Sequence, residues 1–64
     1  MKSIKYKRQM LDMTQKDLSD KVGVSQAALC MYETGESTPS VKVLKKLAKA
    51  LNCTVDELLE NSVV

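Results

Sequence analysis

The stretch TQKDLSDKVGVSQAALCMYETG, residues 14–35, contains two short helical patterns on either side of one glycine. Thr14 precedes the first pattern and Asp17 stands three residues later, a spacing close to that of a helix capping box. Gly23 can adopt the left-handed backbone conformation that ends a helix at low cost, and Ser25 is a favourable N-cap for the second pattern. We therefore expect two helices joined by a turn of three residues, at about 14–22 and 26–34.

The second of these helices is expected to present an uncharged face to solvent. A helical wheel places Leu29 and Tyr32 towards the interior. The side chains that point outward are Gln26, Ala27, Cys30, Met31 and Thr34. A tight glycine turn between two helices is typical of a helix-turn-helix, and a helix that enters a DNA groove needs short side chains without carboxylates, because the flanking phosphates repel acids.

This face has the chemistry to read base edges. Ala27, Cys30 and Met31 are suited to contacts with thymine methyl groups. Gln26 can form a bidentate pair with adenine. In an alternative interpretation, the same uncharged face packs against another subunit or a partner protein.

The rest of the chain predicts an all-α fold, a compact five-helix domain that spans residues 1–64. Ile4, Arg8 and Leu11 are spaced to share one face of the first helix. N-cap signals precede the last two helices, at Ser40 and at the capping box of Thr54 and Glu57. The five helices are expected at about 2–11, 14–22, 26–34, 41–51 and 55–60.

Composition argues against several classes of function. The chain has no His, and its two cysteines, Cys30 and Cys53, are isolated, so neither a zinc site nor a CxxC redox motif is present. We therefore expect no enzyme activity, no metal, no cofactor and no small-molecule ligand. No apolar run approaches the roughly 18 residues of a membrane span, and no signal peptide is visible, so we expect a cytoplasmic protein. The net charge of +2 does not by itself indicate nucleic acid as a partner.

The chain resembles the phage-repressor and Cro family, also called the XRE-type helix-turn-helix, over about residues 8–59. The family's TQxxLxxxxGVS pattern is present at Thr14, Gln15, Leu18, Gly23, Val24 and Ser25. The segment ExGxxxPS follows at Glu33, Gly35, Pro39 and Ser40. The pattern ends with LxxLAKAL at residues 44–51 and DELL at residues 56–59.

The resemblance implies sequence-specific binding of double-stranded DNA by a transcription regulator, most often a repressor. It assigns base reading to Gln26, Ala27, Cys30 and Met31. It assigns phosphate contacts and positioning to Gln15, Ser25, Ser40 and Lys42. It also implies a partly buried ion pair between Arg8 and Glu33. Ser19 stands where the family usually has Ala, so we expect its hydroxyl to bond a backbone carbonyl one turn back.

A single domain of this size offers few base contacts, so we expect a homodimer on a two-fold operator. The dimer surface is expected on the fifth helix and the tail, with Leu59, Val63 and Val64 as apolar candidates. A function of a different class remains open, namely a protein-interaction module such as an antitoxin-like neutraliser.

Overall fold

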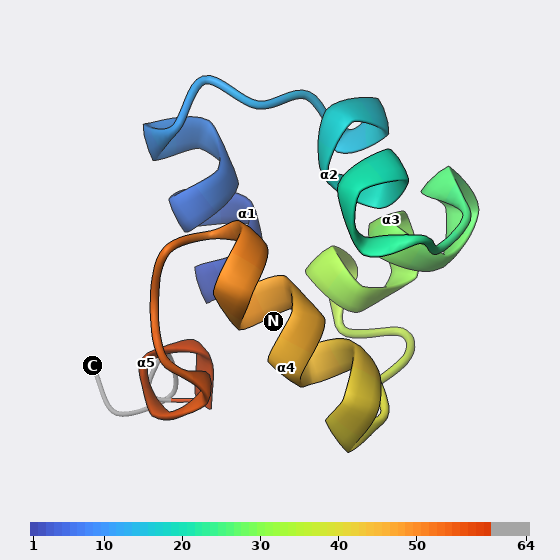
Figure 1. The fold of residues 1–64 in the computed structure, drawn as a ribbon. Coiled ribbons are helices and arrows are strands. Elements are labelled where there is room, and N and C mark those ends of the chain that lie inside the picture. The colour runs from blue at the N-terminus through green and yellow to red at the C-terminus, as the bar shows by residue number, and fades with distance from the viewer. Residues whose placement is uncertain (60–64) are drawn as a thin grey trace.

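The computed structural model describes residues 1–59 and has five helices and no strand in that part of the chain (Figure 1). The helices are α1 (Lys2–Met10), α2 (Gln15–Val22), α3 (Gln26–Thr34), α4 (Val41–Ala50) and α5 (Val55–Leu59). The predicted all-α fold with five helices is therefore confirmed. The predicted end of the fifth helix at residue 60 lies outside the described residues.

Side-chain caps fix where α2, α3, α4 and α5 begin. Thr14 Oγ1 accepts a hydrogen bond from the Asp17 N–H at 3.0 Å, and the Asp17 carboxylate accepts from the Thr14 N–H at 3.0 Å. This full capping box lowers the pKa of Asp17, chiefly through the hydrogen bond from the Thr14 backbone. A second box joins Thr54 and Glu57 at the start of α5. The Glu57 carboxylate accepts from the Thr54 N–H at 3.2 Å, and Thr54 Oγ1 accepts from the Glu57 N–H at 3.1 Å. Such caps contribute about 1 kcal/mol each.

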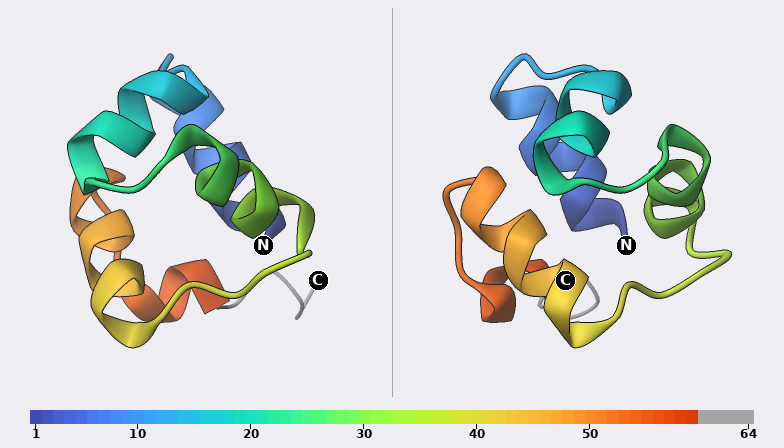
Figure 2. Two further views of the ribbon diagram at one scale, coloured as in Figure 1. Left: turned by 90° about the vertical axis from the view of Figure 1, so that its right-hand side faces the viewer. Right: turned by 45° about the vertical axis from the view of Figure 1, so that its right-hand side comes forward.

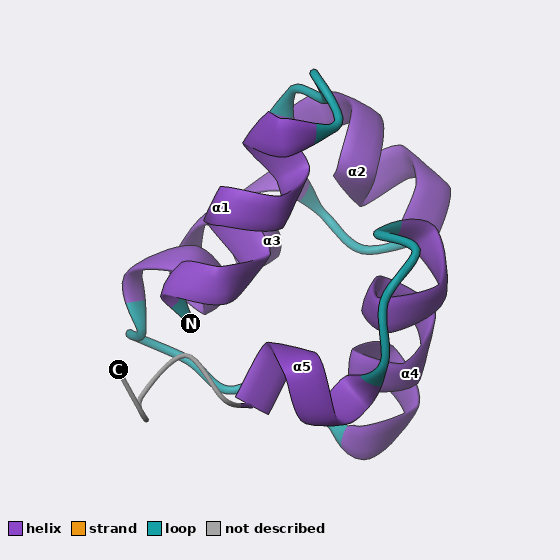
Figure 3. Cartoon of the chain, turned by 90° about the vertical axis from the view of Figure 1, so that its left-hand side faces the viewer, coloured by secondary structure: helices purple, strands orange, loops and turns teal. Residues whose placement is uncertain are grey.

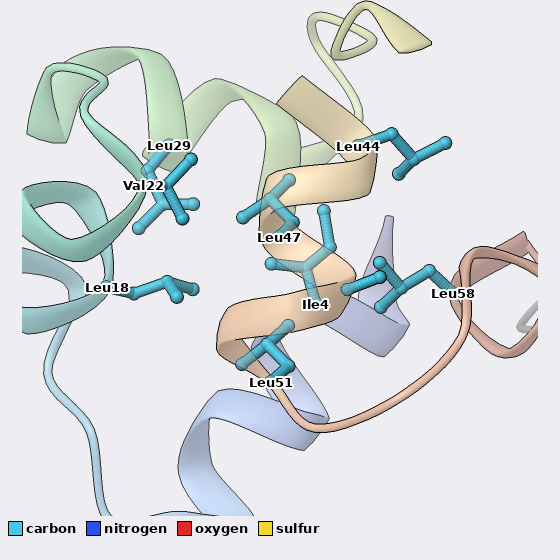
Figure 4. Close-up of a cluster of buried hydrophobic side chains, with 9 residues drawn as sticks. Ile4, Leu18, Val22, Leu29, Leu44, Leu47, Leu51 and Leu58 are labelled. Atoms are coloured by element: carbon cyan, nitrogen blue, oxygen red, sulfur yellow. The ribbon is translucent and has the colours of Figure 1, made fainter. Parts of the chain in front are cut away.

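The core is aliphatic, and every helix contributes to it (Figure 4). Its buried members are Ile4, Leu18, Val22, Leu29, Leu44, Leu47, Ala48, Leu51 and Leu58. Truncating one fully buried Leu or Ile to Ala typically costs 2–5 kcal/mol, because packing contacts and hydrophobic burial are lost together. The core therefore fixes the relative positions of five short helices that would be marginal in isolation.

The first helix ends one residue before the approximate bound expected from the sequence. α1 ends at Met10, and Leu11 is its C-cap with 43% of its surface exposed. Asp12 then adopts a left-handed conformation with φ of 56°. The Met13 N–H bonds the Arg8 carbonyl at 3.1 Å, and the Met13 side chain packs against the core.

α4 ends one residue earlier than predicted, at Ala50. Leu51 is the C-cap, with its N–H bonded to the Leu47 carbonyl at 2.9 Å, and its side chain remains buried. Asn52 then has a φ of 56°, the left-handed conformation in which Asn often follows the end of a helix.

α1 and α3 are neighbours although 15 residues separate them in sequence. The left view of Figure 2 looks onto α3 with α1 behind it, and Figure 3 shows α1 from the opposite side. α2 packs on α3 and α4, whereas α5 packs on α1 and α4. Ser3 donates a buried hydrogen bond of 2.6 Å to the Leu58 carbonyl, so α1 connects α3 with α5.

Candidate nucleic-acid interface

The turn between α2 and α3 is built on Gly23, which has a φ of 85°. The N–H groups of Gly23 and Val24 both donate to the Ser19 carbonyl, at 2.8 and 3.1 Å. Ser19 also closes the preceding turn, because its hydroxyl donates to the Lys16 carbonyl at 3.0 Å as expected. Ser25 then caps α3 by accepting from the Ala28 N–H at 3.0 Å. The polar groups at both ends of this turn are therefore satisfied, which fixes the crossing of α2 and α3.

One face of α3 is exposed and carries no charge. The residues on it are Gln26, Ala27, Cys30, Met31 and Thr34, as the helical wheel predicts. Met31 is 40% exposed, a large apolar side chain in contact with solvent. The opposite face is buried through Leu29 and Glu33. The predicted base-reading residues are thus brought together on one surface.

The buried side of α3 carries an ion pair. Arg8 Nε donates to Glu33 Oε2 at 2.7 Å, and Arg8 Nη2 donates to Glu33 Oε1 at 3.2 Å. The two side chains are only 10% and 3% exposed. Arg8 Nη1 also donates to the Met13 carbonyl at 2.8 Å. Because removal of charges from water is costly, such a pair is tolerated only where its hydrogen bonds are satisfied.

Gln15 completes this cluster, a contact that the sequence does not predict. Gln15 Nε2 donates to Glu33 Oε1 at 3.0 Å from the first position of α2. An amide nitrogen has two hydrogens, so one remains for another acceptor. The half-buried side chain of Gln15 therefore connects the ion pair to the surface at the start of α2.

Ser40 and Lys42 lie at the start of α4, beyond the loop of residues 35–40 that leads away from α3 (Figure 2). Ser40 Oγ accepts from the Val43 N–H at 3.3 Å. The N–H groups of Val41 and Lys42 belong to the first turn of the helix, where a helix supplies no internal acceptor. The side chains of Ser40 and Lys42 are both exposed. Backbone N–H groups without an internal acceptor at a helix start can bind a phosphate.

An edge of α1 that sequence reasoning missed lies beside the α3 face. Lys2, Lys5, Tyr6 and Gln9 of α1 line a shallow depression together with Cys30 and Thr34 of α3. Gln15 and Glu33 form the remainder of its lining. The α1 residues follow the i, i+3, i+4, i+7 spacing of one helix face, and this spacing was the signal available in the sequence.

Residues 1–59 contain no group of three or more His, Cys, Asp or Glu side chains placed to hold a metal ion. Burial raises the pKa of the Cys53 thiol, which disfavours its thiolate form. Over the same residues, none of the helices has the length and apolar character that crossing a membrane requires.

Two helices joined across Gly23, the second with an uncharged and solvent-facing surface, define a helix-turn-helix domain. The family model described as Helix-turn-helix matches residues 4–58. The chain therefore belongs to the helix-turn-helix family, in its XRE type, whose members are non-enzymatic DNA-binding regulators of transcription. The resemblance drawn from the sequence is confirmed.

Relatives of the chain include phage repressors and an archaeal regulator. The chain is 37% identical over 51 residues to the cryptic phage CTXphi transcriptional repressor RstR of Vibrio cholerae, covering 80% of this chain and 46% of the repressor. It is 39% identical over 57 residues to repressor protein C2 of Salmonella phage P22, covering 89% and 26% of the two chains. The chain thus spans less than half the length of either repressor.

An uncharacterized HTH-type transcriptional regulator, MJ0272 of Methanocaldococcus jannaschii, is closer in length. It is 34% identical over 55 residues, covering 86% of this chain and 83% of the regulator. No solved structure matches the chain significantly.

Proposed function

We propose that the chain is a sequence-specific regulator of transcription that places α3 in the major groove of double-stranded DNA. The observation that carries this proposal is the exposed face of α3, which has five neighbouring residues and no charge. A carboxylate on such a face would lie between two rows of phosphates and oppose binding. Relatives named as repressors, one of them as a transcriptional repressor, support the same function, with repression as its form.

The base contacts follow from the side chains of α3. Gln26 lies at the N-terminal end of α3 and is exposed, so its amide can pair with the N6 and N7 of adenine. Ala27, Cys30 and Met31 provide apolar contacts to thymine methyl groups. Because one amide supplies most of the hydrogen bonding, a large share of the selectivity comes from methyl contacts and from DNA shape.

Phosphate contacts flank this face on two sides. The second amide hydrogen of Gln15 is available to a phosphate beside the start of α2, and Ser25 lies at the start of α3. On the other side, the first turn of α4 offers backbone N–H groups beside Ser40, with the ammonium group of Lys42 nearby. These contacts fix the register of the protein on the duplex.

The regulator acts as a homodimer on a two-fold operator, because two half-sites supply the base contacts that one domain lacks. α5 is the proposed contact, with Leu59 51% exposed at its end. The other two apolar candidates, Val63 and Val64, lie outside the described residues.

The test is selection of duplexes from a random pool, followed by titration of the winning sequence at salt concentrations between 50 and 200 mM. The expected result is enrichment of a two-fold site and an affinity that falls steeply with salt, because each phosphate contact releases counterions. Failure to enrich any sequence, with weak and salt-independent binding, would overturn the proposal and favour a protein-interaction module.

A further inference from the structure

We propose that the exposed edge of α1, formed by Lys2, Lys5, Tyr6 and Gln9, is a second backbone-binding edge of the interface. This edge would contact the sugar-phosphate strand that borders α3 on the side of α1. This inference rests on the proposed function, since it needs α3 to lie in the groove.

The α1 edge is continuous with the α3 face. Its four residues line the same depression as Cys30 and Thr34, so a ligand that covers one helix edge meets the other. Figure 3 shows α1 lying across α3, from the side opposite to the left view of Figure 2. A strand of DNA beside α3 would therefore run past α1.

α1 is held rigidly against α3. The Arg8–Glu33 pair joins the two helices at 2.7 Å, and the Met1 amine donates to the Tyr32 carbonyl near the end of α3. On the opposite side of α1, Ser3 bonds the carbonyl of Leu58. The α1 edge is consequently positioned before any ligand arrives, and binding there costs little ordering of the backbone.

The charges of this edge fit a polyanion. Among residues 1–59, neither Lys2 nor Lys5 has a carboxylate within 4.0 Å, whereas Lys7 pairs with Glu57 at 3.4 Å and Lys16 with Asp20 at 3.0 Å. Glu33 is the acid that lines the depression, and both of its oxygens already accept hydrogen bonds from Arg8 and Gln15.

The uncharged members of the edge are also suited to phosphates. Tyr6 is 62% exposed and offers a hydroxyl, and Gln9 is exposed and offers an amide. From Lys2 to Gln9 the helix axis advances about 10 Å at 1.5 Å per residue. The edge is therefore long enough for more than one of its side chains to contact the phosphates of a single strand.

The test compares two double variants of the full chain on the duplex selected with the wild type. Lys2→Gln/Lys5→Gln removes two charges from the α1 edge. Lys46→Gln/Lys49→Gln removes the same charge from α4, where these lysines line a different depression with Lys21. Fluorescence anisotropy over 50–200 mM salt gives the slope of log affinity against log salt for each protein.

The expected result is that the α1 variant loses about 2 units of slope, at roughly 0.9 per phosphate contact. Its affinity should fall by the same factor on the selected and the mismatched duplexes, because phosphate contacts carry no sequence information. The α4 variant should keep the wild-type slope. Equal far-ultraviolet circular dichroism spectra would show that both variants are folded.

The outcomes separate this inference from the proposed function. A wild type that binds steeply with salt, together with an α1 variant that keeps the full slope or loses slope only as much as the α4 variant, would overturn the α1 edge alone. A wild type that selects no duplex would overturn the proposed function, and the α1 edge with it.

Discussion

The two faces of α3 differ from those of a usual amphipathic surface helix in where the charged residue lies. Such a helix normally buries apolar residues and exposes charged ones. In α3 the one charged residue, Glu33, is buried, and the exposed face is neutral. The only carboxylate of α3 therefore points into the domain and is paired with Arg8, which leaves the exposed face free of negative charge.

The two faces also differ in what holds them. The buried face is tied to α1 through Arg8 and to α2 through Gln15, with three hydrogen bonds of 2.7 to 3.2 Å on one carboxylate. The exposed side chains of Gln26 and Ala27 face solvent. The paired carboxylate therefore positions the helix, and the neutral face remains available to a partner.

The largest expected effect follows from breaking the buried face. Glu33→Ala leaves the Arg8 guanidinium buried without its carboxylate, and it removes the acceptor of Gln15. We expect the free energy of unfolding to fall by about 3 kcal/mol, because a buried charge without a partner keeps its desolvation penalty. Urea denaturation followed by circular dichroism measures this change.

Glu36→Ala is the matched control, since it removes an exposed acid three residues further along the chain. It should change the free energy of unfolding by no more than about 0.5 kcal/mol. Similar losses in the two variants would contradict the structural role given to the ion pair and would point to a general effect of net charge.

The second effect comes from making the exposed face resemble that of an ordinary surface helix. Ala27→Glu puts a carboxylate where the proposed function needs none, so the affinity for the selected duplex should fall at least about a hundredfold, or roughly 2.7 kcal/mol. Because Ala27 is exposed, the free energy of unfolding should stay nearly unchanged. Titration of the duplex at fixed salt measures the affinity.

Ala27→Gln is the control for size, because glutamine has nearly the shape of glutamate without its charge. It should lose clearly less affinity than Ala27→Glu at low salt. If both variants bind as the wild type does, α3 does not lie in the groove, and the proposed reading face is wrong.

Local signals in the sequence were enough to predict most of the fold. The caps at Thr14, Ser25 and Ser40 and the helix stop at Gly23 depend on residues within one turn, and all four are present. The outward face of α3 was predictable for the same reason, because helical spacing alone decides which side chains share a surface. The ion pair of Arg8 with Glu33, 25 residues apart, came from the family resemblance rather than from spacing.

The features that were missed depend on tertiary packing. Gln15 reaches Glu33 only because the turn folds α3 under the start of α2. Leu11 has the spacing to share a face with Ile4 and Arg8, but α1 ends before it and its side chain is exposed. The edge of α1 can be recognised as part of the proposed interface only when its position beside the exposed face of α3 is known. None of these follows from local propensity.

The smallest effect tests the turn that decides which face of α3 points outward. A Cβ built on Gly23 meets no atom within 4 Å, so the cost of Gly23→Ala comes only from its φ of 85°. We expect a loss of about 1 kcal/mol in the free energy of unfolding, which lowers Tm by roughly 4–8 °C in a domain of this size.

The folded variant should bind the selected duplex with wild-type affinity, because the hydrogen bonds to the Ser19 carbonyl come from backbone N–H groups that alanine retains. A variant with wild-type stability and weakened binding would instead mean that the turn relaxes and rotates α3, so that the two faces are less firmly defined than the buried ion pair implies.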